Sequence, residues 1–132
     1  MKLIPYLNFP GNAEEALNYY QKIFNGTISD LSRFGGVFPD DTNYQDKIMH
    51  ARLAFGDNML MFSDSMPGQS VDYGNGIYLS IGLTDEAQAR SIFGLLSEGG
   101  KITMPLAKES WGALFGQVTD SYGVNWMINC DL

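Results

Sequence analysis

The sequence contains one histidine, His50, and an arginine, Arg52, follows it two residues later. The run from Lys47 to Phe55 has the alternation of a β-strand, so the two side chains are predicted to share one face. An imidazole can accept or donate a proton near neutral pH, and a guanidinium can hold an anion. The pair is therefore a candidate acid, base or anion-binding group. The alternative is a histidine that only hydrogen-bonds Ser63 on the next strand.

The partner of this strand is predicted from a hairpin signal. Gly56 and Asp57 suit a two-residue turn, after which Asn58 to Ser63 forms the returning strand. The expected cross-strand pairs are Phe55 with Asn58, Arg52 with Met61, and His50 with Ser63. Met61 and Ser63 thus join His50 and Arg52 on one face. The other face is predicted to pack on a helix through Met49, Ala51, Leu53 and Phe55.

Further candidate binding residues lie on other strands and in one loop. Tyr6, Asn8, Tyr78 and Ser80 lie on the mixed faces of two predicted strands. Trp111 is either a stacking wall for a ligand or a cover for the edge of the core. The remaining assignments are structural: Trp126 under a helix, Asp64 and Asp120 as caps of turns, and Cys130 as a buried or edge thiol.

Two helices must position these strands. Asn12 and Glu15 form a capping-box pattern, and an apolar stripe from Ala13 to Phe24 ends at Asn25-Gly26. The second helix is predicted to start at Thr84, with Asp85 and Glu86 near its positive end, and to end at Gly99-Gly100.

The order of the predicted elements is β-α-β-β-β, and it occurs twice. The strands are expected at 3–9, 27–34, 47–55 and 58–63, and again at 77–83, 101–104, 114–119 and 124–129. We expect the first strands to begin at comparable points, Tyr6 and Tyr78, and residues 35–46 to be an insertion in the first copy. A duplicated module is favoured over an ordinary α+β domain with two similar units. The predicted division is module one over 1–66, a linker over 67–75 and module two over 76–132.

Composition narrows the class of protein. The chain has 132 residues, with 15 acidic and 8 basic side chains, a net charge of −7 and a pI near 4.4. This charge argues against binding to nucleic acid or to an anionic membrane surface. One cysteine, no apolar run of membrane-spanning length and no signal peptide lead us to expect a cytoplasmic protein.

The ordered repeat resembles the vicinal oxygen chelate superfamily, which includes glyoxalases, dioxygenases and bleomycin-resistance proteins, and specifically its PhnB-like branch. The residues that carry the resemblance are Tyr6-Leu7-Asn8-Phe9, Gly11-Asn12, Glu15-Ala16, Tyr19-Tyr20, Phe24-Asn25-Gly26, Met49-His50-Ala51, Asn58 to Asp64, Gly99-Gly100, Met104-Pro105-Leu106, Trp111-Gly112, Asp120, Gly123 and Trp126. The resemblance implies an α+β fold in which two tandem βαβββ modules form a curved eight-stranded mixed sheet around a cleft. It also implies a homodimer.

The resemblance also bears on metal binding. Metal-using members carry His, Gln or Glu on the first and last strand of each module. Those positions correspond here to Ile4 or Pro5, Met61, Tyr78 and Met127. These side chains do not supply the oxygen and imidazole ligands that divalent metals prefer. We therefore expect no metal and no cofactor.

Three functions compete on this basis. The first is metal-free binding of an apolar or aromatic small molecule in a cleft lined by Tyr6, Asn8, His50, Arg52, Met61, Ser63, Tyr78, Trp111 and Met127. The second is a lyase or isomerase that uses His50 as acid or base. The third is methyl transfer, a label that PhnB-like chains often carry. No glycine-rich loop between a first strand and a helix supports that third function.

Overall fold

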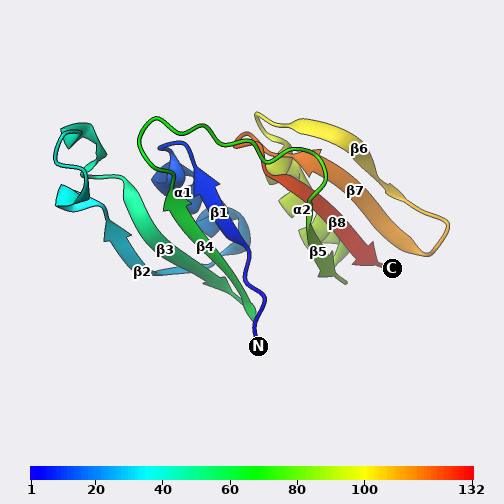
Figure 1. The fold of residues 1–132 in the computed structure, drawn as a ribbon. Coiled ribbons are helices and arrows are strands. Elements are labelled where there is room, and N and C mark those ends of the chain that lie inside the picture. Colours follow the sequence, from blue (N-terminus) through cyan, green and yellow to red (C-terminus); the bar gives the residue numbers. More distant parts are fainter. The chain divides into compact units, whose positions relative to one another are not determined.

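The structure, a computed structural model, describes residues 1–132 and divides them into two units, residues 1–71 and 72–132. Each unit contains one βαβββ module (Figure 1). The predicted α+β fold of tandem modules is therefore confirmed. The eight strands form two four-stranded mixed sheets, one in each unit, rather than a single hydrogen-bonded sheet of eight.

The first unit is a sheet with one helix behind it (Figure 1). Its elements are β1 (Tyr6–Phe9), α1 (Ala13–Phe24), β2 (Thr27–Arg33), β3 (Ile48–Phe55) and β4 (Asn58–Asp64). The strand order is β1-β4-β3-β2, with β1 parallel to β4 and the other pairs antiparallel. This order places β1 beside the last strand of its own module.

The second unit repeats this plan. Its elements are β5 (Leu79–Leu83), α2 (Glu86–Ser97), β6 (Lys101–Lys108), β7 (Ala113–Thr119) and β8 (Asn125–Asp131). The order is β5-β8-β7-β6, and β5 is parallel to β8. Neither helix of the chain is long and apolar enough to cross a membrane.

The core of the first unit lies between α1 and its sheet. The buried residues of α1 follow the predicted 3-4 spacing and include Leu17 and Tyr20. Tyr20 meets Phe62 of β4 with ring centroids 5.9 Å apart, and Phe62 stacks on Phe9 of β1. The side chains that alternate with these core residues point to the opposite face of the sheet.

The helix ends agree with the sequence in part. Asn25 ends α1 in the left-handed conformation, with a φ of 52°, as the Asn25-Gly26 signal predicts. The Asn12 side chain makes no capping hydrogen bond, so the predicted capping box is wrong. The Asp64 carboxylate caps this helix start instead, because its Oδ1 accepts from the amides of Gly11 and Ala13.

The second helix starts at Glu86, two residues later than predicted. Asp85 is its N-cap, and the Asp85 side chain accepts a hydrogen bond of 3.1 Å from the amide of Gln88. The helix ends at Ser97, just before the predicted glycine pair. The hydrogen bond of the Asp85 cap therefore defines the first residue of α2, which the apolar pattern predicted only to within two residues.

The turn between β7 and β8 is organised by Asp120. Its Oδ1 accepts from the amides of Tyr122 and Val124, which confirms the predicted turn cap. Its Oδ2 also accepts from the indole Nε1 of Trp126 at 2.8 Å. Trp126 is buried, as predicted, and Cys130 is fully buried on the same strand.

Candidate functional site

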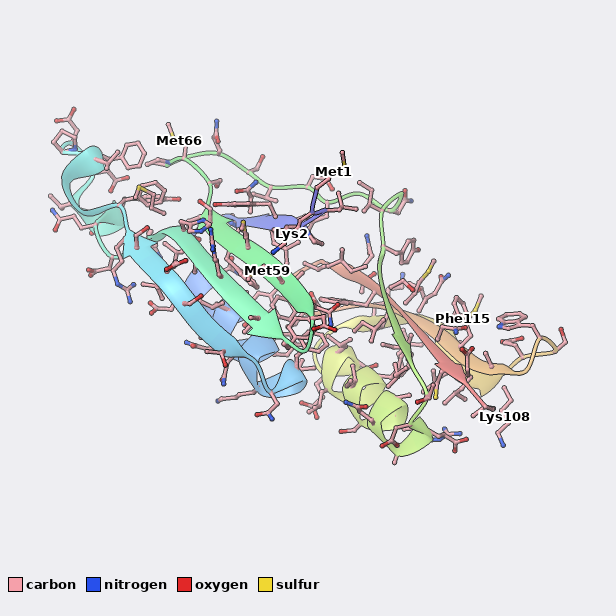
Figure 2. The ribbon with its side chains drawn as sticks, turned by 90° about the horizontal axis from the view of Figure 1, so that it is seen from below. Met1, Lys2, Met59, Met66, Lys108 and Phe115 are labelled. Carbon is pink, nitrogen blue, oxygen red and sulfur yellow. The ribbon has the colours of Figure 1, made fainter.

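The candidate site is the face of the first sheet that is opposite α1. Figure 2 shows the side chains of this sheet, with Met59 labelled on β4. Tyr6 pairs with Met61, Met61 with Arg52, and Arg52 with Ser29, so one row crosses all four strands. Neighbouring strands in such a row are about 4.8 Å apart. The predicted pairs Arg52–Met61 and Phe55–Asn58 are confirmed.

Tyr6 and His50 are joined across this face. The Tyr6 hydroxyl lies 2.9 Å from Nδ1 of His50, and the ring centroids are 5.8 Å apart. Because β4 lies between β1 and β3, the Tyr6 side chain reaches across β4 to make this contact. The alternative of a His50–Ser63 hydrogen bond is wrong, since the Ser63 hydroxyl donates to the carbonyl of Asp64.

Arg52 has an acidic partner that the sequence did not reveal. Nη1 of Arg52 lies 3.3 Å from Oδ2 of Asp30, and both side chains are partly exposed. Asp30 lies in the middle of β2 with a φ of 50°, a left-handed conformation that is unfavourable for a side chain other than glycine. The Nε atom of Arg52 is buried and has no hydrogen-bond partner.

Two β-bulges explain the position of Asp30 and the exposure of Met49, which was predicted to face the helix. Ser29 pairs with Arg52 and Ser32 with His50, so β2 holds one extra residue around Asp30. The next pair is Arg33 with Ile48, so β3 holds one extra residue at Met49. This second bulge leaves Ile48 buried and Met49 42% exposed, contrary to the prediction that Met49 faces the helix.

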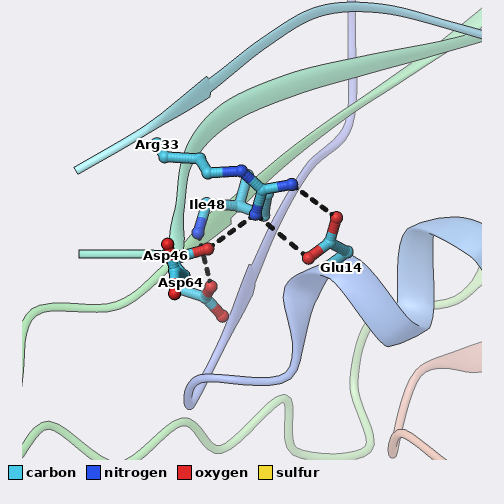
Figure 3. A network of polar contacts seen from close by, with 5 residues as sticks. All are labelled: Glu14, Arg33, Asp46, Ile48 and Asp64. Atoms are coloured by element: carbon cyan, nitrogen blue, oxygen red, sulfur yellow. Dashed lines mark hydrogen bonds and ion pairs between the residues drawn. The ribbon is translucent and has the colours of Figure 1, made fainter. Parts of the chain in front are cut away.

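Asp64 holds the strand that carries His50. Its Oδ2 accepts a 2.8 Å hydrogen bond from the amide of Ile48, at the start of β3 (Figure 3). With the two bonds to the start of α1, this buried carboxylate binds three backbone amides. Its role is therefore wider than the turn cap that the sequence predicted.

An exposed ion pair lies close to this carboxylate. Arg33 donates to both carboxylate oxygens of Glu14, at 3.0 and 2.7 Å, and to the carbonyl of Asp46 (Figure 3). The hydrogen bond from Arg33 lowers the pKa of the Glu14 carboxyl, and the same bond raises the pKa of Arg33. The pair links the first turn of α1 to the end of β2. Through the Asp46 carbonyl it also reaches the loop that connects β2 to β3.

The insertion between β2 and β3 has defined structure. It contains short 3-10 helices at Gly35–Val37 and Thr42–Tyr44. Phe34, Phe38 and Tyr44 form an aromatic group with centroid distances of 5.1 to 5.7 Å. The Tyr44 hydroxyl donates to the carbonyl of Ser65, and burial raises the pKa of Tyr44. The insertion is thus joined to the residue that follows β4.

The other predicted site residues lie in the second unit. Met127 of β8 is paired with Ser80 and with Gln117, and Trp111 contacts Phe115 edge-on at 5.8 Å. Trp111 is 62% exposed, so it does not cover the core. Tyr78 precedes β5, which begins at Leu79.

The pairing also corrects the alignment of the two modules. Tyr6 pairs with Met61, and Ser80 pairs with Met127, so Ser80 rather than Tyr78 occupies the position of Tyr6. By the same register Gln117 corresponds to Arg52. The charged row of the first sheet therefore has an uncharged counterpart in the second.

The sequence did not indicate two neighbours of the candidate site residues: Asp30, which contacts Arg52, and Phe115, which contacts Trp111. Phe115 alternates with buried residues of β7, and that alternation was a signal for its outward direction. Asp30 had no such signal, because a bulge inside an apparently regular strand depends on pairing between strands.

The positions that hold metal ligands in metal-using members do not fit a divalent metal here. On the correspondence that the resemblance predicts they are Ile4 or Pro5, Met61, Tyr78 and Met127, whose only polar groups are thioethers and a phenol. No three His, Cys, Asp or Glu side chains in the chain are grouped as metal ligands. The donor set of this face suits hydrogen bonding and apolar contact.

Comparison with known proteins identifies relatives over the whole chain. A family model described as 3-demethylubiquinone-9 3-methyltransferase matches residues 1–129. Protein YjdN of Escherichia coli K12 is 32% identical over 98% of this chain and 95% of its own. The crystal structure of protein PA1353 from Pseudomonas aeruginosa has a TM-score of 0.87 and 40% identity, covering 99% of this chain and 98% of that one.

A further solved structure carries the family name. It is described as a putative 3-demethylubiquinone-9 3-methyltransferase, PhnB protein, from Bacillus cereus. It has a TM-score of 0.86 and 27% identity, and the match covers 98% of this chain and 99% of that one. With the tandem βαβββ modules described above, these matches show that the chain belongs to this PhnB-like family.

Proposed function

We propose that the protein binds a small organic molecule without a metal, on the face of the first sheet opposite α1. The observation that carries this proposal is the hydrogen bond between Tyr6 and His50, which holds an imidazole on the face of the sheet that α1 does not cover. Tyr6, itself 46% exposed, and the thioether of Met61 provide apolar surface beside it. Asn8, Ser63 and Arg52 add polar groups that would orient a ligand.

The ligand we propose is small and has an apolar or aromatic part. Thioethers are polarizable and adaptable, and they make favourable contacts with aromatic rings. Met59 and Met61 lie on the same face of β4, and Met61 lies between Tyr6 and Arg52. Such a surface favours a flat ligand with one polar end.

The test is binding to isotope-labelled protein. A panel of small aromatic compounds is titrated while the ring signals of His50 are followed by NMR. We expect members of the panel to shift these signals in the wild type and to bind more weakly to Tyr6→Phe. The exposed Lys108→Ala variant of β6 is the control and should bind as the wild type does. A panel that leaves the His50 signals unchanged would contradict the proposal.

A second candidate function is that of a lyase or isomerase with His50 as acid or base. The Tyr6–His50 hydrogen bond favours it, because a fixed partner on Nδ1 orients the imidazole and leaves Nε2 for a substrate. The two functions differ in turnover. A compound that shifts the His50 signals and is then converted, at a rate lost in His50→Ala, would support the enzyme.

The name of the family suggests methyl transfer, which we do not propose for this chain. β1 is connected to α1 by Pro10, Gly11 and Asn12, a short link with one glycine. Nucleotide-like cofactors are usually held by a glycine-rich loop at such a place. Isothermal titration calorimetry with a nucleotide-containing methyl donor tests whether the chain binds such a cofactor. Tight binding would favour methyl transfer as the function.

We further propose that the protein forms a homodimer, which rests on the family resemblance. Light scattering coupled to size-exclusion chromatography should give about twice the chain mass of 14.6 kDa. A single species at the chain mass would contradict the dimer and leave the binding proposal unaffected.

A further inference from the structure

We infer that the ligand of this face is an aromatic or apolar molecule with a carboxylate, and that Asp30 competes with this carboxylate for Arg52. The inference rests on the proposed function and adds to it the charge of the ligand and an internal competitor.

Arg52 supplies positive charge on the proposed binding face. The chain has a net charge of −7, so an anion is repelled by the molecule as a whole and needs local positive charge. The other first-unit arginine, Arg33, has both its terminal nitrogens bonded to Glu14 or Asp46. Arg52 lies on the proposed binding face, two residues from His50, and offers that charge.

Asp30 engages only part of the Arg52 guanidinium. Its contact with Asp30 is a single approach of 3.3 Å, and the Asp30 side chain is 62% exposed. A guanidinium that binds a carboxylate through two parallel hydrogen bonds does so at about 2.7–2.9 Å. The Nη1 contact with Asp30 is longer than such bonds, so Asp30 leaves part of the donor capacity of the guanidinium unused. Exposed ion pairs of this kind are weak and easily exchanged.

The backbone of Asp30 has a conformation that the equivalent strand of the second unit does not need. The equivalent edge strand of the second unit, β6, also has an extra residue, between Met104 and Ala107. Yet Asp30 and the helix cap Asn25 are the only non-glycine residues of the chain with a positive φ. The bulge in β2 therefore places a carboxylate beside Arg52 at a conformational cost that β6 does not have.

The side chains beside Arg52 suit the apolar part of the ligand. The row Tyr6–Met61–Arg52 runs from an aromatic ring through a thioether to the guanidinium. The equivalent row of the second sheet is Ser80–Met127–Gln117 and has no ring or charge. A carboxylate on Arg52 would therefore place an attached ring over Met61 and toward Tyr6. This is the arrangement of a small aromatic acid.

The test compares benzoate with its neutral analogue benzamide at constant ionic strength and near-neutral pH. Binding is followed by NMR on the backbone amides of β3 and on His50. We expect Asp30→Asn to bind benzoate several-fold more tightly than the wild type, with benzamide unchanged. Asp57→Asn is the matched control, because it removes the same charge at the exposed hairpin turn and should change neither affinity.

A second variant tests the guanidinium itself. Arg52→Gln should lose benzoate binding and keep benzamide binding. The inference is overturned if Asp30→Asn binds benzoate no more tightly than Asp57→Asn does, or if Arg52→Gln binds it as well as the wild type. If benzamide binds all variants, and benzoate binds the wild type, Asp30→Asn and Arg52→Gln with the same affinity, the proposed function stands and the inference fails. If no aromatic compound shifts these signals in any variant, both fail.

Discussion

The carboxylate of Asp64, at the end of β4, accepts a hydrogen bond of 2.8 Å from the amide of Ile48, at the start of β3. Its other oxygen binds the amides of Gly11 and Ala13. One buried side chain therefore joins the entry to α1, the end of β4 and the strand that carries His50 and Arg52. The geometry of the proposed site depends on this carboxylate, although the carboxylate itself binds only backbone amides.

Removal of this carboxylate should be strongly destabilising. Asp64→Ala leaves three backbone amides without their acceptor, and each buried unsatisfied donor costs about 1–3 kcal/mol. We expect a loss on the order of 3 kcal/mol in the free energy of unfolding, measured by urea denaturation. Asp57→Ala, at the exposed turn between β3 and β4, should change stability by no more than about 0.5 kcal/mol. Equal stability of the two variants would show that the Asp64 contacts are energetically unimportant.

The Glu14–Arg33 pair should make a small, pH-dependent contribution. The hydrogen bond from Arg33 lowers the pKa of Glu14 in the folded chain. Its contribution is therefore present above the ordinary glutamate pKa and is lost as the pH falls through the lowered value. Because both side chains are well exposed, a double-mutant cycle with Glu14→Gln and Arg33→Gln should give a coupling of about 0.2–1 kcal/mol at neutral pH. Coupling that persists at pH 2 would contradict an electrostatic origin.

Tyr73 should titrate later than an ordinary tyrosine. Burial, with a further contribution from the nearby Asp120, raises its pKa to about 12. The neutral phenol is favoured by folding, so this stabilisation is complete below the ordinary tyrosine pKa and declines as the pH rises toward about 12. Difference absorbance of phenolate should show a late component that Tyr73→Phe removes. The same late component in Tyr73→Phe would assign it to another tyrosine.

Cys130 should be unreactive in the folded protein. The residue is fully buried in β8, and burial raises the pKa of its thiol, which lowers the thiolate fraction. A disulfide reagent should modify it only after denaturant unfolds the chain. Rapid stoichiometric modification without denaturant would show that the second sheet opens locally.

The sequence predicted those parts of the fold that depend on local pattern. The apolar stripe of α1, its end at Asn25 and the hairpin pair Arg52–Met61 follow from spacing and turn chemistry alone. The sequence did not reveal contacts that depend on pairing over long distances. Asp64 binds residues more than 50 positions away, and no local pattern distinguishes it from a turn cap.

The candidate site was predicted to a similar extent. Alternation along β3 and β4 places His50, Arg52 and Met61 on one face. Tyr6 was assigned to the lining of the cleft, but its hydrogen bond to His50 depends on the parallel pairing of β1 with β4. Asp30 was not assigned, because its direction results from an extra residue that only the register of β2 against β3 reveals.

The bulges also bear on how the protein avoids self-association through its sheet edges. β2 and β6 are outermost in their sheets, and an outermost strand has unpaired amides and carbonyls that a further chain can bind. The extra residues in β2 and β6 interrupt that row of groups, and Pro105 in β6 lacks an amide hydrogen altogether. The opposite edges are strands of only 4 and 5 residues. Each sheet therefore ends in edges that are poor templates for fibril growth.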